Sequence, residues 1–180
     1  MSFTRKFYTL DLHLGHHQIL QHCSATRPFD GVEDMDRAIV DRINDRVSKD
    51  DLLYIVGDFA LSGDAEYVRH LFHEIRARKS LILGNHDVDN KGRVSKTIHD
   101  LAWDRPPAAA LETTDEGGHV YLHHYACRVW PRHLRGSYHL FGHSHGNLSP
   151  LGRSRDVGID CLDANFAPMT FREIQETLND

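Results

Sequence analysis

Five short apolar runs, each followed directly by glycine, histidine, aspartate or asparagine, constrain this chain more than any other feature. Their length and composition are typical of strands, as is a weaker run at RDVGID. The five runs are KFYTL (6–10), DLLYIV (51–56), SLILG (80–84), HVYLH (119–123) and YHLFG (138–142). Because ligand sites in α/β proteins lie beyond the carboxyl ends of strands, we expect the polar residues after these runs to meet.

Helices are predicted between several of the strands. One follows Asp30, which is a candidate cap, with Glu33 three positions on as in a capping box. A second begins near Asp64, and its basic tail RARK (76–79) is expected at the negative C-terminal end of the helix. Shorter helices are predicted at HHQILQHC and FREIQETL. This alternation favours an α/β sandwich of one or two mixed sheets between helices.

Length and composition exclude several classes of protein. A chain of 180 residues suits one domain, residues 1–180, with a core of its own. The three cysteines, Cys23, Cys127 and Cys161, have no CxxC spacing, which favours a reducing compartment and argues against a thiolate zinc cluster. They are predicted to be small buried hydrophobic residues. With no signal peptide and no membrane-spanning run, we expect a soluble, cytoplasmic protein that binds no membrane.

The charge distribution limits the partners that the chain can bind. The net charge is −5 with histidines neutral, and the basic residues are interspersed with acidic ones. This pattern does not predict a general nucleic-acid binder. A small anionic substrate stays compatible with it.

The residues that follow the strands supply the ligands that a metal centre needs. They combine imidazole nitrogens, carboxylate oxygens and one amide oxygen, without sulfur: Asp11, His13, Asp58, Asn85, His124, His143 and His145. The mixture suits borderline divalent ions such as Mn, Fe, Co, Ni or Zn, and it is too large for one tetrahedral zinc. With a carboxylate such as Asp58 bridging, two ions would share a hydroxide and clamp an in-line phosphoryl displacement.

Five motifs occur in a fixed order, each after a predicted strand: DLHLGH (11–16), GD (57–58), GNHD (84–87), HHY (123–125) and GHSH (142–145). In this ordered set the chain resembles the calcineurin-like metallophosphoesterase superfamily over residues 11–145. The phrases RPF, HYACRVW and SYHLFGHSHG further resemble its small bacterial and phage-type members. The resemblance implies a four-layer αββα sandwich of mixed β-sheets flanked by helices, with two divalent metal ions, manganese among the candidates.

The resemblance also implies which residue binds which ion. Asp58 would bridge the two metals, and His124 is preferred to His123 because the family's ligand is the histidine of an HY-like pair. The first metal would be held by Asp11, His13 and His145, and the second by Asn85, His124 and His143.

Other residues near these motifs are candidates for catalysis. His86 of GNHD would be the general acid that protonates the leaving oxygen, although a spacer role stays open. Asp87 would orient His86 or cap the following turn. His16 is either a substrate contact or a surface histidine at a helix start.

One departure from the family concerns phosphate binding. Protein phosphatases of the superfamily continue GD into GDxxDRG, whereas this chain has GDFALSG, with Leu61 in place of the second aspartate and no arginine. This argues against a protein phosphatase. Arg27 and Arg128 are the candidate phosphate ligands because guanidinium matches phosphate geometry, with structural or solvent-exposed roles as the alternatives.

The sequence therefore predicts a dinuclear metal-dependent phosphoesterase. Metal-bound hydroxide would attack phosphorus while His86 protonates the departing alkoxide. Phosphodiesters of nucleotide type are favoured, with nucleic-acid ends also possible, because no large cap insertion is visible unless residues 87–118 form one. The alternatives are a phosphomonoesterase with a small substrate and an interaction module on the same fold. HExxH is absent, which disfavours a metalloprotease. The oligomeric state is not readable.

Overall fold

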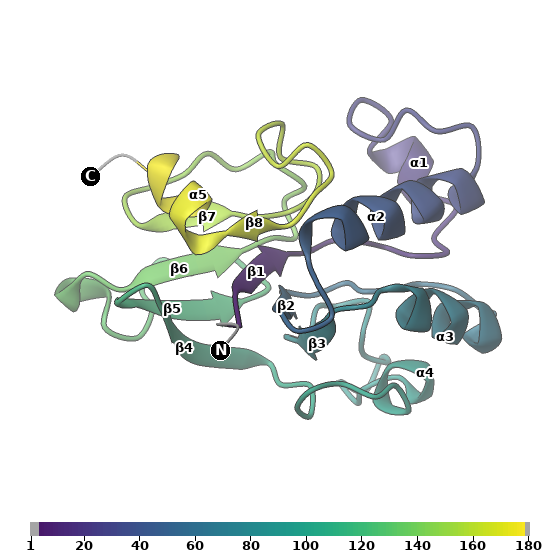
Figure 1. Ribbon diagram of the computed structural model, residues 1–180, viewed down its shortest axis with the longest axis horizontal. Coiled ribbons are helices and arrows are strands. Elements are labelled where there is room, and N and C mark those ends of the chain that lie inside the picture. The colour runs from purple at the N-terminus through teal and green to yellow at the C-terminus, as the bar shows by residue number, and fades with distance from the viewer. Residues whose placement is uncertain (1–3, 179–180) are drawn as a thin grey trace.

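A computed structural model describes residues 4–178, and it consists of two four-stranded sheets with helices around them (Figure 1). The first sheet has the order β3-β2-β1-β8. Its strands are β1 (Lys6–Thr9), β2 (Leu52–Ile55), β3 (Arg78–Leu81) and β8 (Met169–Thr170). β1, β2 and β3 are parallel, and β8 runs antiparallel to β1. The sheet is mixed, as predicted.

The second sheet is also mixed and has the order β4-β5-β6-β7. Its strands are β4 (Ala110–Asp115), β5 (Gly118–His123), β6 (Tyr138–Phe141) and β7 (Ser154–Asp156). β4 and β5 are antiparallel, while β5, β6 and β7 are parallel. β4 and β8 were not among the predicted strands. β4 alternates polar and small residues with few large apolar ones, and β8 is only two residues long.

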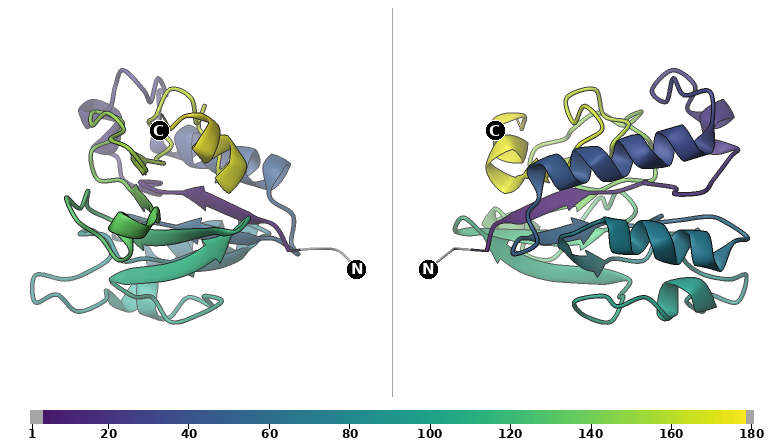
Figure 2. Two further views of the ribbon diagram at one scale, coloured as in Figure 1. Left: turned by 90° about the vertical axis from the view of Figure 1, so that its left-hand side faces the viewer. Right: turned by 45° about the vertical axis from the view of Figure 1, so that its right-hand side comes forward.

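Helices α2 (Val32–Arg46) and α3 (Ala65–Glu74) cover the outer face of the first sheet, as the views of Figure 2 show. Asp64 caps α3 as predicted, because its carboxylate accepts from the backbone N–H groups of Glu66 and Tyr67. The prediction of Asp30 as the cap of α2 is wrong, since the extended residue before the helix is Gly31. The predicted basic tail of α3 is also wrong, because Arg78 belongs to β3.

Three shorter helices and one 3₁₀ turn complete the secondary structure. The two predicted short helices are present as α1 (Ile19–His22) and α5 (Phe171–Glu176), and α4 (Lys96–His99) was not predicted. A 3₁₀ turn, η1, spans His133–Arg135. Among the described residues, no helix is both long and apolar enough to cross a membrane.

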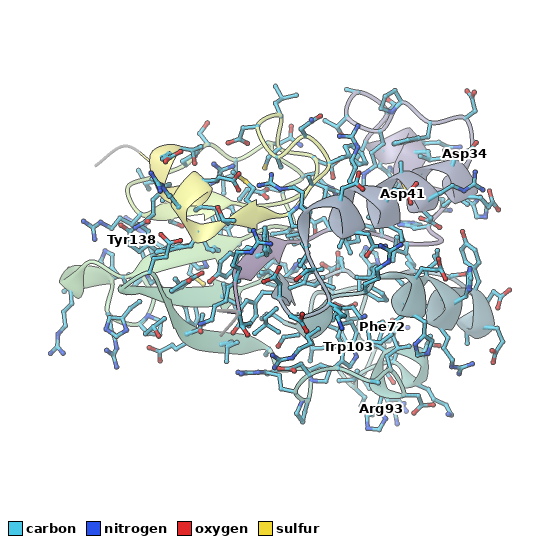
Figure 3. All side chains as sticks on the ribbon, in the orientation of Figure 1. Asp34, Asp41, Phe72, Arg93, Trp103 and Tyr138 are labelled. Atoms are coloured by element: carbon cyan, nitrogen blue, oxygen red, sulfur yellow. The ribbon has the colours of Figure 1, made fainter. Side chains whose placement is uncertain are left out.

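Strand alternation divides the apolar residues between two cores. Phe7 and Leu53 face α2 and α3, whereas Tyr8 and Tyr54 point between the sheets and stack on each other at 5.5 Å. At the edge of the first core, the rings of Phe72 and Trp103 pack edge to face at 4.8 Å, below α3 (Figure 3). The first strands are therefore buried on both faces, which fixes the loops that follow them.

The two outer layers of the sandwich differ in secondary structure. α5 closes the side near β7 and β8, with Phe171 buried against Tyr8 and Tyr138 (Figure 1). The outer face of the second sheet is covered by residues 125–137, where Trp130 stacks on His139 with ring centroids 5.3 Å apart. The predicted fold class, two mixed sheets flanked by helices, is confirmed. Over the second sheet, however, the fourth layer is a loop with η1 rather than a long helix.

Candidate metal centre

The predicted metal ligands lie at the carboxyl ends of strands from both sheets. The segments after β1 and β2 are bonded to each other, because Asp11 N donates to the Gly57 carbonyl at 3.1 Å and His13 N donates to the Asp58 carbonyl at 3.0 Å. Five predicted ligands have left-handed backbone conformations, which are rare outside glycine: Asp11, His13, Asp58, His143 and His145. Such strain gathers at functional sites when the surrounding structure enforces it.

One group of ligand atoms comes from Asp11, His13 and His145, within 4.8 Å of one another. Asp11 Oδ2 accepts from the backbone N–H of His143 at 2.9 Å. Within the described part of the chain, Asp11 Oδ1 and His13 Nε2 are buried without a hydrogen-bond partner. Burial raises the pKa of Asp11 well above its usual value, whereas burial and the charge of Arg27 lower the pKa of His13 to about 2. A neutral imidazole beside a carboxyl oxygen without a partner fits a cation, whose binding would keep both groups deprotonated.

A second group comes from Asp58, His124 and His143, again within 4.8 Å of one another. His124 Nδ1 lies 3.0 Å from the Val56 carbonyl, which only accepts, so this nitrogen carries the proton. The Nε2 lone pair then faces Asn85 Oδ1 at 3.1 Å and Asp58 Oδ2 at 3.6 Å. These three atoms, one nitrogen and two oxygens, are all acceptors with no proton between them. Such an arrangement fits a cation.

Asp58 lies between the two groups. Its Oδ2 is 3.5 Å from His13 Nε2 and 3.6 Å from His124 Nε2. Its Oδ1 accepts from the backbone N–H of His86 at 2.9 Å, which fixes the carboxylate. A Cβ on Gly84 would lie 2.2 Å from the same Oδ1, so the backbone approaches Asp58 as closely as only glycine allows. These contacts hold the Asp58 carboxylate between the two groups.

Asp160 is a site residue that the sequence analysis missed. Its Oδ2 accepts from His145 Nδ1 at 2.7 Å, which leaves His145 Nε2 for a metal. Burial alone lowers the pKa of His145, but the hydrogen bond to Asp160 raises it to about 10, so an ion at Nε2 would have to displace a proton. Asp160 is the last residue of the weak RDVGID run, where an Asp after a Gly and an Ile was the available signal.

Arg27 is not a phosphate ligand, and that prediction is corrected. The side chain is 1% exposed and pairs with Asp160 at 2.7 Å. Its remaining donors bond to the carbonyls of Asp11 and Leu12. Arg27 therefore lies beneath the centre and holds the segment after β1 in place.

Asp87 holds backbone segments together. Its carboxylate accepts from the N–H groups of Gly84, Asp58 and Phe59 at 2.8–3.1 Å. Burial raises its pKa to about 7 against the effect of these hydrogen bonds. Of the two predicted roles, orienting the His86 ring is wrong, because these bonds tie the segment after β2 to the turn at 84–87.

His86 and His16 border a depression of about 340 Å³ next to the first ligand group. The ring of His86 packs against His13 at 5.2 Å and against His16 at 5.7 Å. His16 Nδ1 lies 3.0 Å from His13 Nδ1, and burial followed by the His86 charge lowers the pKa of His16. Both side chains are placed to reach a molecule bound over the ligands.

Arg128 is exposed and lines a larger depression of about 1200 Å³, together with Trp130 and His133. Asn147 lines both depressions, so they adjoin. The predicted phosphate contact of Arg128 stays a prediction.

Comparison with known proteins supports the fold but names no function. No protein-family model matches the chain. The Gene 66 protein of Mycobacterium phage D29 is 27% identical over 196 aligned residues, covering 97% of this chain and 96% of that protein. The protein of unknown function AQ665 from Aquifex aeolicus superposes with a TM-score of 0.71 at 19% identity, over 97% of this chain and 99% of the other. This chain shares the fold of the Aquifex protein.

A more distant match is YfcE, a phosphoesterase from E. coli. It has a TM-score of 0.42 and 14% identity, over 86% of this chain and 78% of YfcE. Similarity at this level says nothing about the activity of this chain.

Proposed function

We propose that this protein is a dinuclear metal-dependent phosphoesterase of the calcineurin-like type. One observation carries the proposal: Asp58 Oδ2 lies 3.5–3.6 Å from imidazole nitrogens of two ligand groups. Unpartnered buried acceptors in the described structure, Asp11 Oδ1 and His13 Nε2, add to it. The donors are nitrogen and oxygen, the set that borderline divalent ions take.

The residues fit two ions as the resemblance implies. Asp58 would bridge, with Asp11, His13 and His145 on one side and Asn85, His124 and His143 on the other. When bound, the ions lower the pKa of a water molecule and neutralise charge on a phosphoryl group. Asp160 holds the His145 ring through Nδ1, and the Val56 carbonyl holds the His124 ring in the same way.

His86 is the residue we assign to proton transfer. It is half-buried at the edge of the 340 Å³ depression, and its backbone N–H is bonded to Asp58. A substrate phosphate over the ligands would therefore have its leaving oxygen next to the imidazole, which can donate a proton to it. The neighbouring His16 and His13 rings pack against His86 and limit its rotation.

We further propose a phosphodiester substrate of nucleotide type. The adjoining 1200 Å³ depression offers exposed Arg128 and the half-buried ring of Trp130. Guanidinium pairs with phosphate and aromatic rings stack on bases, so a nucleotide fits better here than a small monoester does.

The test is hydrolysis of bis-p-nitrophenyl phosphate against p-nitrophenyl phosphate. Protein stripped of metal and reloaded with Mn, Ni or Zn is compared with Asp58→Asn, His86→Ala and the control His70→Ala, an exposed histidine on α3. We expect metal-dependent diester cleavage that is lost in Asp58→Asn and kept in His70→Ala. Preference for the monoester would reject the substrate class, and no turnover of either ester with two ions bound would reject the enzyme.

The role of His86 is tested separately, by comparing esters with good and poor leaving groups. Nitrophenolate leaves without a proton, so His86→Ala should slow poor leaving groups, such as alkyl esters, far more than nitrophenyl esters. A typical loss on the poor leaving groups is about 10²–10⁴-fold. Equal losses on both kinds of ester would reject His86 as the general acid.

A further inference from the structure

A further group of possible metal ligands, apart from the two groups of the candidate metal centre, lies on the outer face of the second sheet. His123 ends β5, His139 lies in β6, and Cys127 follows β5 in the covering segment. Each residue offers one ligand atom, and these atoms lie within 4.8 Å of one another. The adjacent His124 points to the opposite side of the sheet, toward the carbonyl of Val56, which is the residue after β2. The group is therefore separate from the candidate metal centre.

The sheet register places the two histidines together. β5 and β6 are parallel, with Tyr121 opposite His139, and alternate residues of a strand share a face. Tyr121 stacks on His123 at 6.0 Å and contacts His139 at 5.6 Å. His123 and His139 therefore lie diagonally across β5 and β6 on the same face of the sheet, with Tyr121 beside both.

One ring nitrogen of His139 is buried beside this group without a hydrogen-bond partner among the described residues. Its side chain is fully buried, and Nδ1 bonds to Ser154 Oγ at 2.9 Å. Across residues 4–178, His139 Nε2 has no hydrogen-bond partner. The ring is held by Trp130 on one side and Phe141 on the other, so it does not turn to find one. A buried ring nitrogen without a partner is costly unless it binds a ligand.

Cys127 supplies sulfur next to the two histidines. Its Sγ lies 3.5 Å from His123 Nδ1 and 3.6 Å from the Tyr125 carbonyl. The side chain is half-buried and lines the 1200 Å³ depression, so an ion and a further ligand have access from solvent. Metal-binding histidines are oriented by donating the N–H of the other ring nitrogen to an acceptor, and Ser154 Oγ can accept from His139 Nδ1 in this way.

We propose that His123, Cys127 and His139 form a mononuclear zinc site on the outer face of the second sheet. Two imidazoles and a thiolate are zinc ligands, and the fourth tetrahedral position would be open to water from the depression. Sulfur distinguishes it from the candidate metal centre, whose predicted ligands are nitrogen and oxygen only. Binding would tie residues 123–127, which carry His124, to β6. The proposal does not depend on the proposed function.

The test is cobalt titration of metal-stripped protein, read by absorption. A thiolate bound to Co²⁺ gives a sulfur-to-cobalt charge-transfer band, which nitrogen and oxygen ligands cannot give. We expect a band whose final intensity corresponds to one thiolate-bound cobalt per chain. Cobalt in the candidate metal centre should add nothing to this band, and the band should be lost in Cys127→Ser. The band should persist in Asp58→Asn, which alters only the candidate metal centre. The band therefore tests the zinc site even if the proposed function is wrong.

Cys23→Ser is the matched control, because Cys23 lies in a different group with His145 and Asp160. The band should persist in this variant. Absence of a band in the native protein, a band unchanged in Cys127→Ser, or one lost only in Cys23→Ser would each overturn the site.

A second measurement covers the case that Cys127→Ser does not fold. Native protein is alkylated with iodoacetamide with and without zinc, and the peptide that contains Cys127 is followed by mass spectrometry. One equivalent of zinc beyond the two that fill the candidate metal centre should slow alkylation of Cys127 at least tenfold. An unchanged alkylation rate at saturating zinc would overturn the proposal.

Discussion

Substitution of Gly84 by alanine isolates the position of Asp58 without removing any ligand. The added Cβ would lie 2.2 Å from Asp58 Oδ1 and 2.6 Å from Asp58 N. Ordinary van der Waals contact needs about 3.5 Å, so the carboxylate or its backbone has to move by about 1 Å. The carboxylate is 2% exposed and bonded to His86 N, so the movement breaks an existing contact rather than filling open space.

The expected effect follows from the size of that movement. A misplacement of about 1 Å costs roughly 10²-fold in rate, which is about 3 kcal/mol of transition-state stabilisation. We therefore expect Gly84→Ala to lower kcat/KM for bis-p-nitrophenyl phosphate by about 10²-fold. The number of metal ions retained after dialysis should also fall, because Asp58 would be a ligand of both ions.

Gly63→Ala is the matched control for this experiment. Gly63 is exposed, and no heavy atom of the described chain lies within 4 Å of the Cβ that alanine would add. Circular dichroism and urea unfolding check that both variants are folded during the assay. Native kcat/KM with two ions retained in folded Gly84→Ala would refute the bridging role of Asp58.

Two further predictions concern stability, both measured by urea unfolding of metal-free protein. Against the effect of burial, hydrogen bonds from Arg5 and Ser48 hold the pKa of Asp51 at about 2, below its ordinary 3.8. This stabilisation is complete above pH 3.8 and is lost as the pH falls toward 2, so Asp51→Asn should cost about 1–2 kcal/mol at pH 7 and less at pH 3. An equal cost at both pH values would contradict the assignment. Arg27→Met leaves Asp160 buried without its charged partner and should cost about 3–5 kcal/mol; unchanged unfolding would show that the pair is not structural.

The meeting of the predicted ligands at one edge of the sheets was predictable because each of them comes soon after a strand. Asp11 and Asp58 come two or three residues after buried runs, and parallel pairing of β1 with β2 brings those ends together. The local order of the motifs was therefore sufficient to assemble Asp58 between two histidine groups. No long-range contact had to be known in advance.

Arg27 and Asp87 were harder to interpret, because sequence reports the charge of a side chain and not its burial. Arg27 is paired with Asp160, 133 residues later, so no local pattern indicates that its donors are used. Asp87 bonds to the segment after β2, 28 and 29 residues earlier. Both roles depend on how the strands are arranged in space.

Cys127 is a residue whose neighbours in the fold could not be predicted from its position in the sequence. Spacing in the sequence argues against a cysteine cluster, since the three cysteines are far apart. The structure brings Cys127 next to two histidines from neighbouring strands, one of them twelve positions later. β4 was missed for a related reason, because its polar alternation becomes a strand only through pairing with β5.

The most direct test of the central claim is anomalous X-ray diffraction from crystals soaked in Mn²⁺. The account predicts two strong manganese peaks on either side of Asp58 Oδ2, about 3.5–4 Å apart. One peak should contact Asp11, His13 and His145, and the other Asn85, His124 and His143. A single peak, or peaks that do not share Asp58, would contradict the dinuclear centre.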